Sequence, residues 1–127
     1  MKVYLSGGMY SGWQDQLPRF EGVNYFDPRL HSQQNVSAIK FVIDDLKAIR
    51  ECDLVFCYIE ETNPMPLGAT WECAVASENN IPIITVWEKS YVDPFFACNS
   101  LYLHKDFKEG VKRLEKYVNR QLSNGGN

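Results

Sequence analysis

The chain has 127 residues and a mass of 14.7 kDa, which is enough for one domain with a single buried core. Hydrophobic residues make up 45% and charged residues 23%, an ordinary composition for a globular protein. The net charge of −3 and the isoelectric point near 5.3 argue against a nucleic acid or an anionic membrane as the partner.

No apolar run approaches the roughly 20 residues that a membrane-spanning helix needs, and the N-terminal stretch MKVYLSGGMY is too short and too polar for a signal peptide. We therefore expect a cytoplasmic protein. Its four cysteines form no CxxC pair and have no histidine at metal-ligand spacing; they are Cys52, Cys57, Cys73 and Cys98. We expect reduced thiols, no metal site and no cofactor.

The first third of the chain contains short β-type runs separated by polar segments. The pattern predicts, in chain order, a strand at Lys2–Ser6, a weak helix at Ser11–Phe20, a strand at Val23–Phe26 and a surface loop at Arg29–Val36.

The middle of the chain has the clearest periodicity. Apolar residues recur at helical spacing from Ser37 to Glu51, with Ser37 as the N-cap. Leu54–Ile59 is continuously apolar, as in a central parallel strand that is covered on both faces. Glu60–Leu67 contains two prolines and is expected to be a loop, and Gly68–Asn80 is expected to be a helix. Small residues give this helix a face that can approach a sheet closely: Ala69, Cys73, Ala74 and Ala76.

The last third predicts a buried strand at Ile81–Trp87, a short strand at Leu101–Leu103 and an amphipathic helix at Asp106–Leu122. The apolar face of that helix consists of Phe107, Val111, Leu114 and Val118. We expect one domain over residues 1–122 and a disordered tail over residues 123–127.

Strands that alternate with helices predict an α/β fold with right-handed crossovers. The expected architecture is a single flavodoxin-like or Rossmann-like domain, with a five-stranded parallel sheet in the order 2-1-3-4-5 and helices on both faces. In that order the second and third strands lie on opposite sides of the first. Ligands usually bind at the carboxyl ends of the first and third strands, where the order of the strands changes in this way. The loops Gly7–Gly12 and Glu60–Gly68 should meet there and form a cleft.

Glu72 is the first candidate for chemistry in this cleft. It follows Gly68 by four residues, which places it in or near the first turn of its helix. Backbone amides and the helix dipole favour negative charge at that position. We therefore expect an ionised Glu72 that is available as a nucleophile; the alternative is an acid that only stabilises its own helix.

Two further groups are candidates for the same cleft. Either Asp44 or Asp45 could point toward it, with the other in solvent, although a capping or surface role is the alternative for both. After the first strand, Gly7 and Gly8 would let backbone amides approach a ligand.

The following loop carries two aromatic residues. Tyr10 and Trp13 could stack on a flat ring, with core packing as the alternative for Trp13.

Five stretches together resemble the nucleoside 2-deoxyribosyltransferase family and its nucleotide N-glycosidase relatives. They are KVYLSGGM, WQDQL, FDPR, DDLKAIRECDLVFCYIE and PLGATWECAVASENNIPIITV, and the similarity extends over about residues 2 to 88. The resemblance implies the same parallel α/β fold and a small nucleoside or nucleotide as the substrate.

The resemblance also assigns roles to particular residues. The segment from Gly68 to Glu72 matches the family's Gly-x-x-x-Glu, so Glu72 would attack the anomeric carbon of a 2-deoxyribose. The pair Asp45-Leu46 matches the acid that positions the nucleophile or handles the proton of the base. Tyr10 matches an aromatic residue after the first strand.

One departure from the family pattern lies before Gly68. Family transferases carry an Asp there to bind the base, whereas this chain has Thr62–Leu67, in which Asn63 is the nearest polar substitute. Substrate binding is accordingly expected to involve Gly7, Gly8, Met9, Tyr10, Trp13, Asn63, Gly68 and Asn99. The family completes its site from a neighbouring subunit, which implies a homo-oligomer, with Asn99 as the candidate that reaches across.

The leading hypothesis is cleavage of the N-glycosidic bond of a 2′-deoxynucleoside through a covalent deoxyribosyl-Glu72 intermediate, with transfer to another nucleobase. One alternative is hydrolysis of a nucleoside 5′-monophosphate, for which the Gly7–Ser11 loop or Arg29 would hold the phosphate. A second is a non-catalytic nucleotide-binding module. A third is a flavin binder, which the GGMYSG loop fits poorly.

Overall fold

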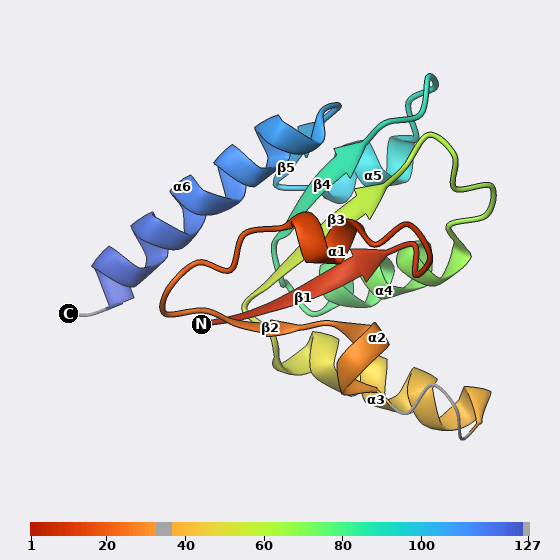
Figure 1. Cartoon of the computed structure of the whole chain (residues 1–127), viewed down its shortest axis with the longest axis horizontal. Helices are drawn as coiled ribbons and strands as arrows, with labels where there is room; N and C mark the ends of the chain where they lie inside the picture. Colours follow the sequence, from red (N-terminus) through yellow and green to blue (C-terminus); the bar gives the residue numbers. More distant parts are fainter. Residues whose placement is uncertain (33–36, 126–127) are drawn as a thin grey trace.

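The computed structural model describes residues 1–32 and 37–125, and all statements below concern these residues. Five strands form one parallel sheet in the order β2-β1-β3-β4-β5, as the sequence predicts (Figure 1). The strands are β1 (Lys2–Gly7), β2 (Asn24–Phe26), β3 (Leu54–Ile59), β4 (Ile83–Trp87) and β5 (Tyr102–His104). The helices are α1 (Trp13–Gln16), α2 (Pro28–His31), α3 (Ala38–Glu51), α4 (Leu67–Glu78), α5 (Pro94–Asn99) and α6 (Phe107–Gly125).

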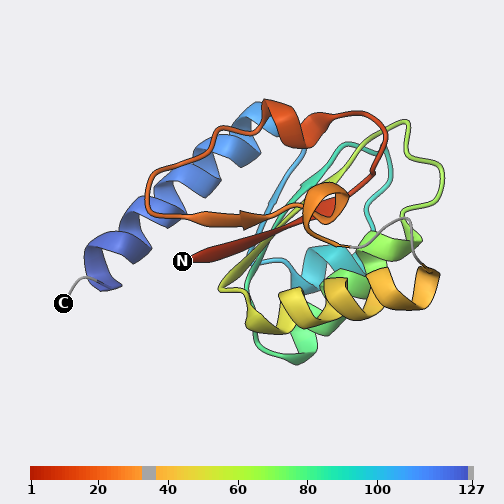
Figure 2. The same ribbon diagram turned by 60° about the horizontal axis from the view of Figure 1, so that its bottom comes forward.

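Helices cover both faces of the sheet and create two separate cores. On one face α3, α4 and α5 lie next to one another, and on the opposite face lie α1 and α6 (Figure 2). The first core includes Tyr4, Val55 and Cys57, and the second includes Val3 and Leu5. Alternate residues of one strand therefore enter different cores, as the two-residue period of a strand requires.

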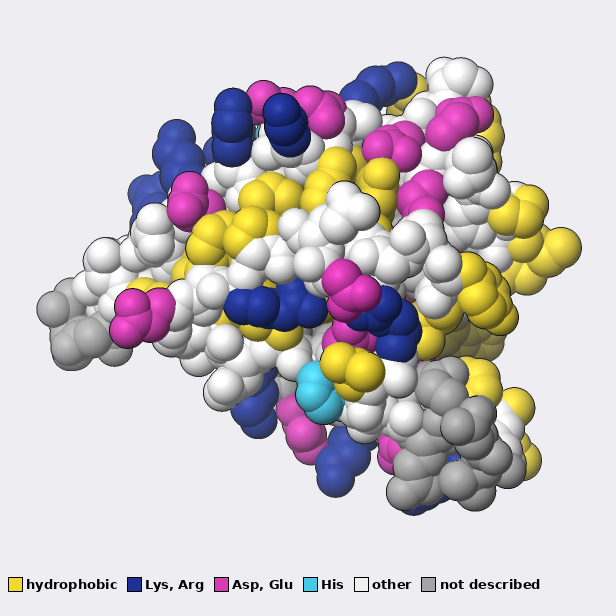
Figure 3. Space-filling model, in the orientation of Figure 1, with side chains coloured by type: hydrophobic (Ala, Val, Ile, Leu, Met, Phe, Trp, Pro, Cys, Tyr) yellow, Lys and Arg dark blue, Asp and Glu magenta, His cyan; other side chains and the backbone are white. Residues whose placement is uncertain are grey.

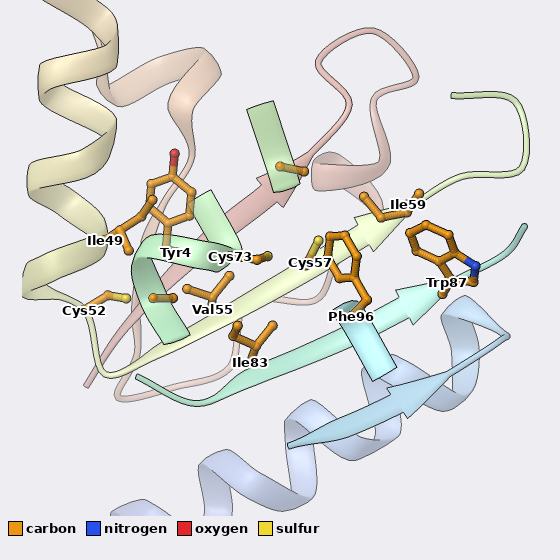
Figure 4. Packing of buried hydrophobic residues seen from close by; sticks show 12 residues of the cluster. Tyr4, Ile49, Cys52, Val55, Cys57, Ile59, Cys73, Ile83, Trp87 and Phe96 are labelled. Atoms are coloured by element: carbon orange, nitrogen blue, oxygen red, sulfur yellow. The ribbon is translucent and has the colours of Figure 1, made fainter. Parts of the chain in front are cut away.

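The small-residue face of α4 packs against the sheet as predicted, with one exception. Ala69, Cys73 and Ala76 are buried, whereas Ala74 is exposed. Figure 4 shows Cys73 of α4 lying over Cys57 of β3. Because the buried side chains are small, α4 lies close enough to β1 and β3 for its longer side chains to reach them.

Several predicted boundaries are wrong. The predicted helix at Ser11–Phe20 is only the four-residue α1, because the chain becomes extended at Leu17, before Pro18. The predicted loop at Arg29–Val36 begins with α2, which Asp27 caps by accepting a hydrogen bond from the Arg29 backbone N–H; residues 33–36 lie outside the described part. The predicted tail is helical up to Gly125.

The sequence pattern does not predict α5. This six-residue helix begins with Asp93 as its N-cap and Pro94 in its first turn, a combination that is typical of a helix start. Among the described residues, no helix has the length and hydropathy needed to cross a membrane. Lys and Arg side chains line the outer surface of α6 (Figure 3).

Candidate active site

Glu72 extends from the second turn of α4 to the middle of the sheet, and two hydroxyl groups of β1 hold its carboxyl group. Tyr4 donates a hydrogen bond from its phenol to Oε2 of Glu72. Ser6 Oγ donates to Oε1 at 2.8 Å. Tyr4 and Ser6 are both fully buried and lie two residues apart, so they project from the same face of β1. Each carboxyl oxygen therefore has one hydroxyl donor.

Burial raises the pKa of Glu72 from its ordinary value of 4.5 to about 7, with a smaller contribution from the charge of Asp45; the Tyr4 and Ser6 hydrogen bonds oppose the shift. The expectation of a fully ionised Glu72 at a helix N-terminus is therefore wrong. Because α4 begins at Leu67, Glu72 lies beyond the first turn, where the free backbone amides are. Desolvation, which disfavours the charged form, outweighs the hydrogen bonds.

Asp45 of α3 shares the site with Glu72, and Asp44 points elsewhere. Asp45 is buried and its Oδ1 accepts no hydrogen bond from the described residues. Burial raises its pKa to about 6; a hydrogen bond from Ser32 opposes the rise, and the charge of Asp44 adds to it. Asp44 is half-buried and lies 4.0 Å from Lys40 Nζ. Of the two acids that the sequence left open, Asp45 is the one at the candidate site.

A cavity of about 310 Å³ joins these two acids. It lies between α3 and the beginning of α4, and its walls are mainly apolar; its lining is Phe41, Val42, Asp45, Leu46, Leu67, Gly68, Trp71 and Glu72. Gly68 has nothing within 4 Å of where a Cβ would be, so the backbone there is open to a ligand. The cavity thus combines two protonatable oxygen groups with a surface that suits a flat ring or a sugar.

The pKa values of the two carboxyl groups lie close together, at about 6 for Asp45 and about 7 for Glu72. The charge of Asp45 contributes to the raised pKa of Glu72. Two hydroxyl donors favour the charged form of Glu72, and a hydrogen bond from Ser32 favours that of Asp45, while burial opposes both effects. Near neutral pH Glu72 is therefore present both as the acid and as the carboxylate.

The two predicted loops meet at the carboxyl edge of the sheet. Gly7 has a φ of +149°, and a Cβ there would lie 2.4 Å from the Tyr58 carbonyl oxygen, so only glycine fits. A Cβ on Gly8 would lie 2.7 Å from Glu60 Oε1 and 3.4 Å from Asn63 Nδ2. Gly7, Gly8 and Asn63 are therefore neighbours, as the predicted cleft requires, and Met9 follows in the same loop, half-buried.

Like Gly7, Gly8, Met9 and Asn63, the three remaining candidates are not among the residues that line this cavity. Trp13 is 3% exposed, packs against Phe56 and donates from Nε1 to the Gly8 carbonyl at 3.0 Å, which favours the core-packing alternative. Tyr10 is 100% exposed. Asn99 lies on α5, where its Oδ1 accepts a hydrogen bond from Ser77 Oγ at 2.8 Å.

The sequence pattern does not single out Tyr4 and Ser6. Both precede Gly7 and Gly8, and the pattern predicts them only as part of a β-type run. A usable signal was present: Tyr4 and Ser6 are the two hydroxyl residues of the run and are two positions apart, so they had to share one face of the strand.

A scan against protein-family models and a search of curated proteins find no match. Among solved structures, the chain is similar to a 2-deoxyribosyltransferase from Bacillus psychrosaccharolyticus, with a TM-score of 0.70 and 18% identity over 86% of this chain and 89% of that one. It is also similar to the CMP N-glycosidase BcmB from Clostridium botulinum, with a TM-score of 0.64 and 20% identity over 91% of this chain and 99% of that one. The chain therefore has the fold of these two proteins, and the fold that the sequence resemblance implied is confirmed.

Proposed function

We propose that this protein cleaves the N-glycosidic bond of a 2′-deoxynucleoside through Glu72 and transfers the deoxyribosyl group to another nucleobase. The observation that carries the proposal is the carboxyl group of Glu72, which two buried hydroxyls hold beside a second acid in one cavity. The similarity of fold to a 2-deoxyribosyltransferase and to a CMP N-glycosidase supports it.

In the first step a Glu72 oxygen forms a bond to C1′ of the sugar while the bond from C1′ to the base nitrogen breaks. The bonding electrons leave with the base. The transition state resembles an oxocarbenium ion, which a carboxylate stabilises and then traps as an ester. A 2-deoxy sugar suits this route because it has no 2′-hydroxyl to destabilise the positive charge.

Asp45 supplies and recovers the proton. The departing base takes up a proton on the nitrogen that was bonded to C1′ or elsewhere on its ring, and a protonated Asp45 can donate this proton. In the second step the nitrogen of the incoming base attacks C1′, its proton returns to Asp45, and Glu72 is released as a carboxylate. The unpartnered Oδ1 of Asp45 is consistent with an acid that exchanges a proton with substrate.

Two observations favour a nucleoside over its 5′-monophosphate. None of the described residues that line the cavity is Lys, Arg or His, while two of them are acids, which would repel a phosphate. Arg29, the cation suggested by the sequence, already donates to Asp27 at 2.7 Å and to Asp15 at 2.8 Å. Hydrolysis of a monophosphate therefore requires a phosphate site elsewhere.

Base recognition is proposed for Asn63, whose amide can pair with a base edge. Its Oδ1 now accepts the Met65 backbone N–H at 3.2 Å, which leaves the Nδ2 hydrogens for the Gly8 side of the cleft.

We also propose that the protein forms a homo-oligomer. Three apolar side chains on the first turns of α3 and two on α4 are exposed: Ile39, Val42, Ile43, Leu67 and Trp71. Val42, Leu67 and Trp71 of this apolar surface also line the cavity, and an exposed patch of this kind is typical of an interface. Sedimentation of the wild type and of Trp71→Glu tests the proposal, since the substitution should produce monomers.

The experiment that tests the function is an incubation of the protein with each 2′-deoxynucleoside and each 5′-monophosphate, with and without a free acceptor base. We expect base exchange from nucleosides and a loss on the order of 10⁴-fold or more in Glu72→Ala. Base release from monophosphates alone would favour the hydrolase alternative. Ligand binding without base release would favour a non-catalytic nucleotide-binding module, and full activity of Glu72→Ala would contradict the mechanism.

A further inference from the structure

Ser6 is a buried hydroxyl that contacts Glu72 and the thiol of Cys73 beside it. It lies in the middle of the most buried part of β1 and is 0% exposed. Of its two neighbours along the strand, Leu5 points to the other face and Gly7 has no side chain. The one side-chain oxygen within its donor range in the described structure is Oε1 of Glu72, at 2.8 Å.

The two hydroxyls of β1 have different consequences for the carboxyl group. Tyr4 reaches Oε2 from one side, and its ring is fixed by stacking on Phe26 at a centroid distance of 5.3 Å. Ser6 reaches Oε1 from a position one pleat closer to the carboxyl edge of the sheet. Contacts at both oxygens fix the rotation of the carboxyl plane, which a single contact would leave free.

The groups that face Glu72 come from each element packed on it. Tyr4 lies on β1, Asp45 on α3 and Cys73 beside Glu72 on α4, where Cys73 contacts Cys57 of β3. Burial raises the pKa of Tyr4 far above its ordinary value, and contact with Cys57 together with burial raises that of Cys73. Both groups are therefore neutral near pH 7, which leaves Asp45 as the neighbour whose charge changes together with that of Glu72.

We propose that Ser6 is a positioning residue for Glu72: its hydroxyl holds Oε1 in a fixed orientation and stabilises the carboxylate against protonation. A hydrogen bond to the charged form of an acid favours that form. Because Ser6 is fully buried, water cannot replace its hydroxyl without a local opening of the structure. The catalytic part of this inference rests on the proposed function, while the effect on ionisation does not.

The test compares Ser6→Ala with Thr85→Val, a matched loss of a buried hydroxyl on β4. The Thr85 hydroxyl pairs with Ser100 Oγ at 2.6 Å and has no contact with Glu72 in the described structure. Two quantities are measured for each variant: the pH profile of base release, and the titration midpoint of the Glu72 carboxyl by carbon NMR without substrate.

In Ser6→Ala we expect the midpoint and the acid limb of the profile to move up by about one pH unit, the usual effect of one hydrogen bond to a charged group. On the acid limb, the activity of Ser6→Ala should then be about tenfold lower than that of the wild type at the same pH. At pH 9 the two activities should agree within about twofold. Thr85→Val should leave both quantities unchanged.

An unchanged midpoint in folded Ser6→Ala would overturn the inference. So would an equal shift in Thr85→Val, because it would show that the loss of any buried hydroxyl in the sheet has this effect. If the wild type releases no base from any substrate, the proposed function fails, but the NMR titration still decides the role of Ser6.

Discussion

The two faces of β1 contain residues of different kinds although they share a backbone. Val3 and Leu5 point toward α1 and α6 and are surrounded by apolar side chains. Tyr4 and Ser6 point toward α3 and α4 and donate to a carboxyl group. One strand can therefore stabilise the fold on one face and hold a carboxyl group on the other, because alternate residues have separate environments.

The two faces also differ in their energetic roles. Burial of apolar surface on the α1 and α6 side is favourable and independent of pH. Burial of two acids on the α3 and α4 side is unfavourable in their charged forms, as the raised pKa values of Glu72 and Asp45 show. Substitutions on the first face should therefore change stability, and those on the second should change activity.

The largest effect that separates the faces is expected for Asp45→Asn. Loss of a proton donor should reduce base release by roughly 10² to 10⁴-fold, while the free energy of unfolding stays near its wild-type value or rises. Steady-state kinetics and urea unfolding measure the two effects. Asp44→Asn is the matched control, and a similar loss of activity in both variants would contradict the assignment of Asp45.

The converse substitution is Leu5→Ala, on the apolar face of the same strand. Leu5 is 1% exposed, so its truncation should lower the free energy of unfolding by about 2–5 kcal/mol, measured by urea unfolding. The rate of base release per folded molecule should change little. If it falls as far as in Asp45→Asn, the two faces are not separate.

A smaller effect concerns the pH dependence of stability. Because the pKa of Glu72 rises from 4.5 unfolded to about 7 folded, its favourable contribution is complete below about pH 4.5 and is lost as the pH rises through 7. Glu72→Gln removes this dependence. Relative to wild type, the variant should gain about 2 kcal/mol of stability between pH 5 and pH 8, measured by urea unfolding at both values. A loss of stability relative to wild type between pH 5 and pH 8 would show instead that the fold stabilises Glu72 as a carboxylate.

The sequence predicted the sheet order well because its strands are strongly apolar and are separated by clear helical patterns. Leu54–Ile59 has the same bounds in prediction and structure. The Ser37 cap was also predicted, and its side chain accepts the Lys40 backbone N–H at 3.2 Å. Short elements such as α2 and α5 were missed because a four- or six-residue helix has too few turns to show a period.

The candidate site was predicted in part. Spacing placed Glu72 on its helix and the resemblance selected Asp45, and both line one cavity. The ionisation of Glu72 could not be predicted, because it depends on how deeply neighbouring elements bury the side chain. The same limit applies to Trp13, because a sequence does not show which face of the sheet an aromatic residue of a connecting loop will reach.

The central claim is that Glu72 forms a covalent bond to the sugar. The direct measurement is rapid acid quenching of the protein with a 2′-deoxynucleoside in the absence of an acceptor base, followed by peptide mass spectrometry. The account predicts a deoxyribosyl adduct on the peptide that contains Glu72, absent from Glu72→Ala. Release of base without an adduct, or an adduct on another residue, would contradict it.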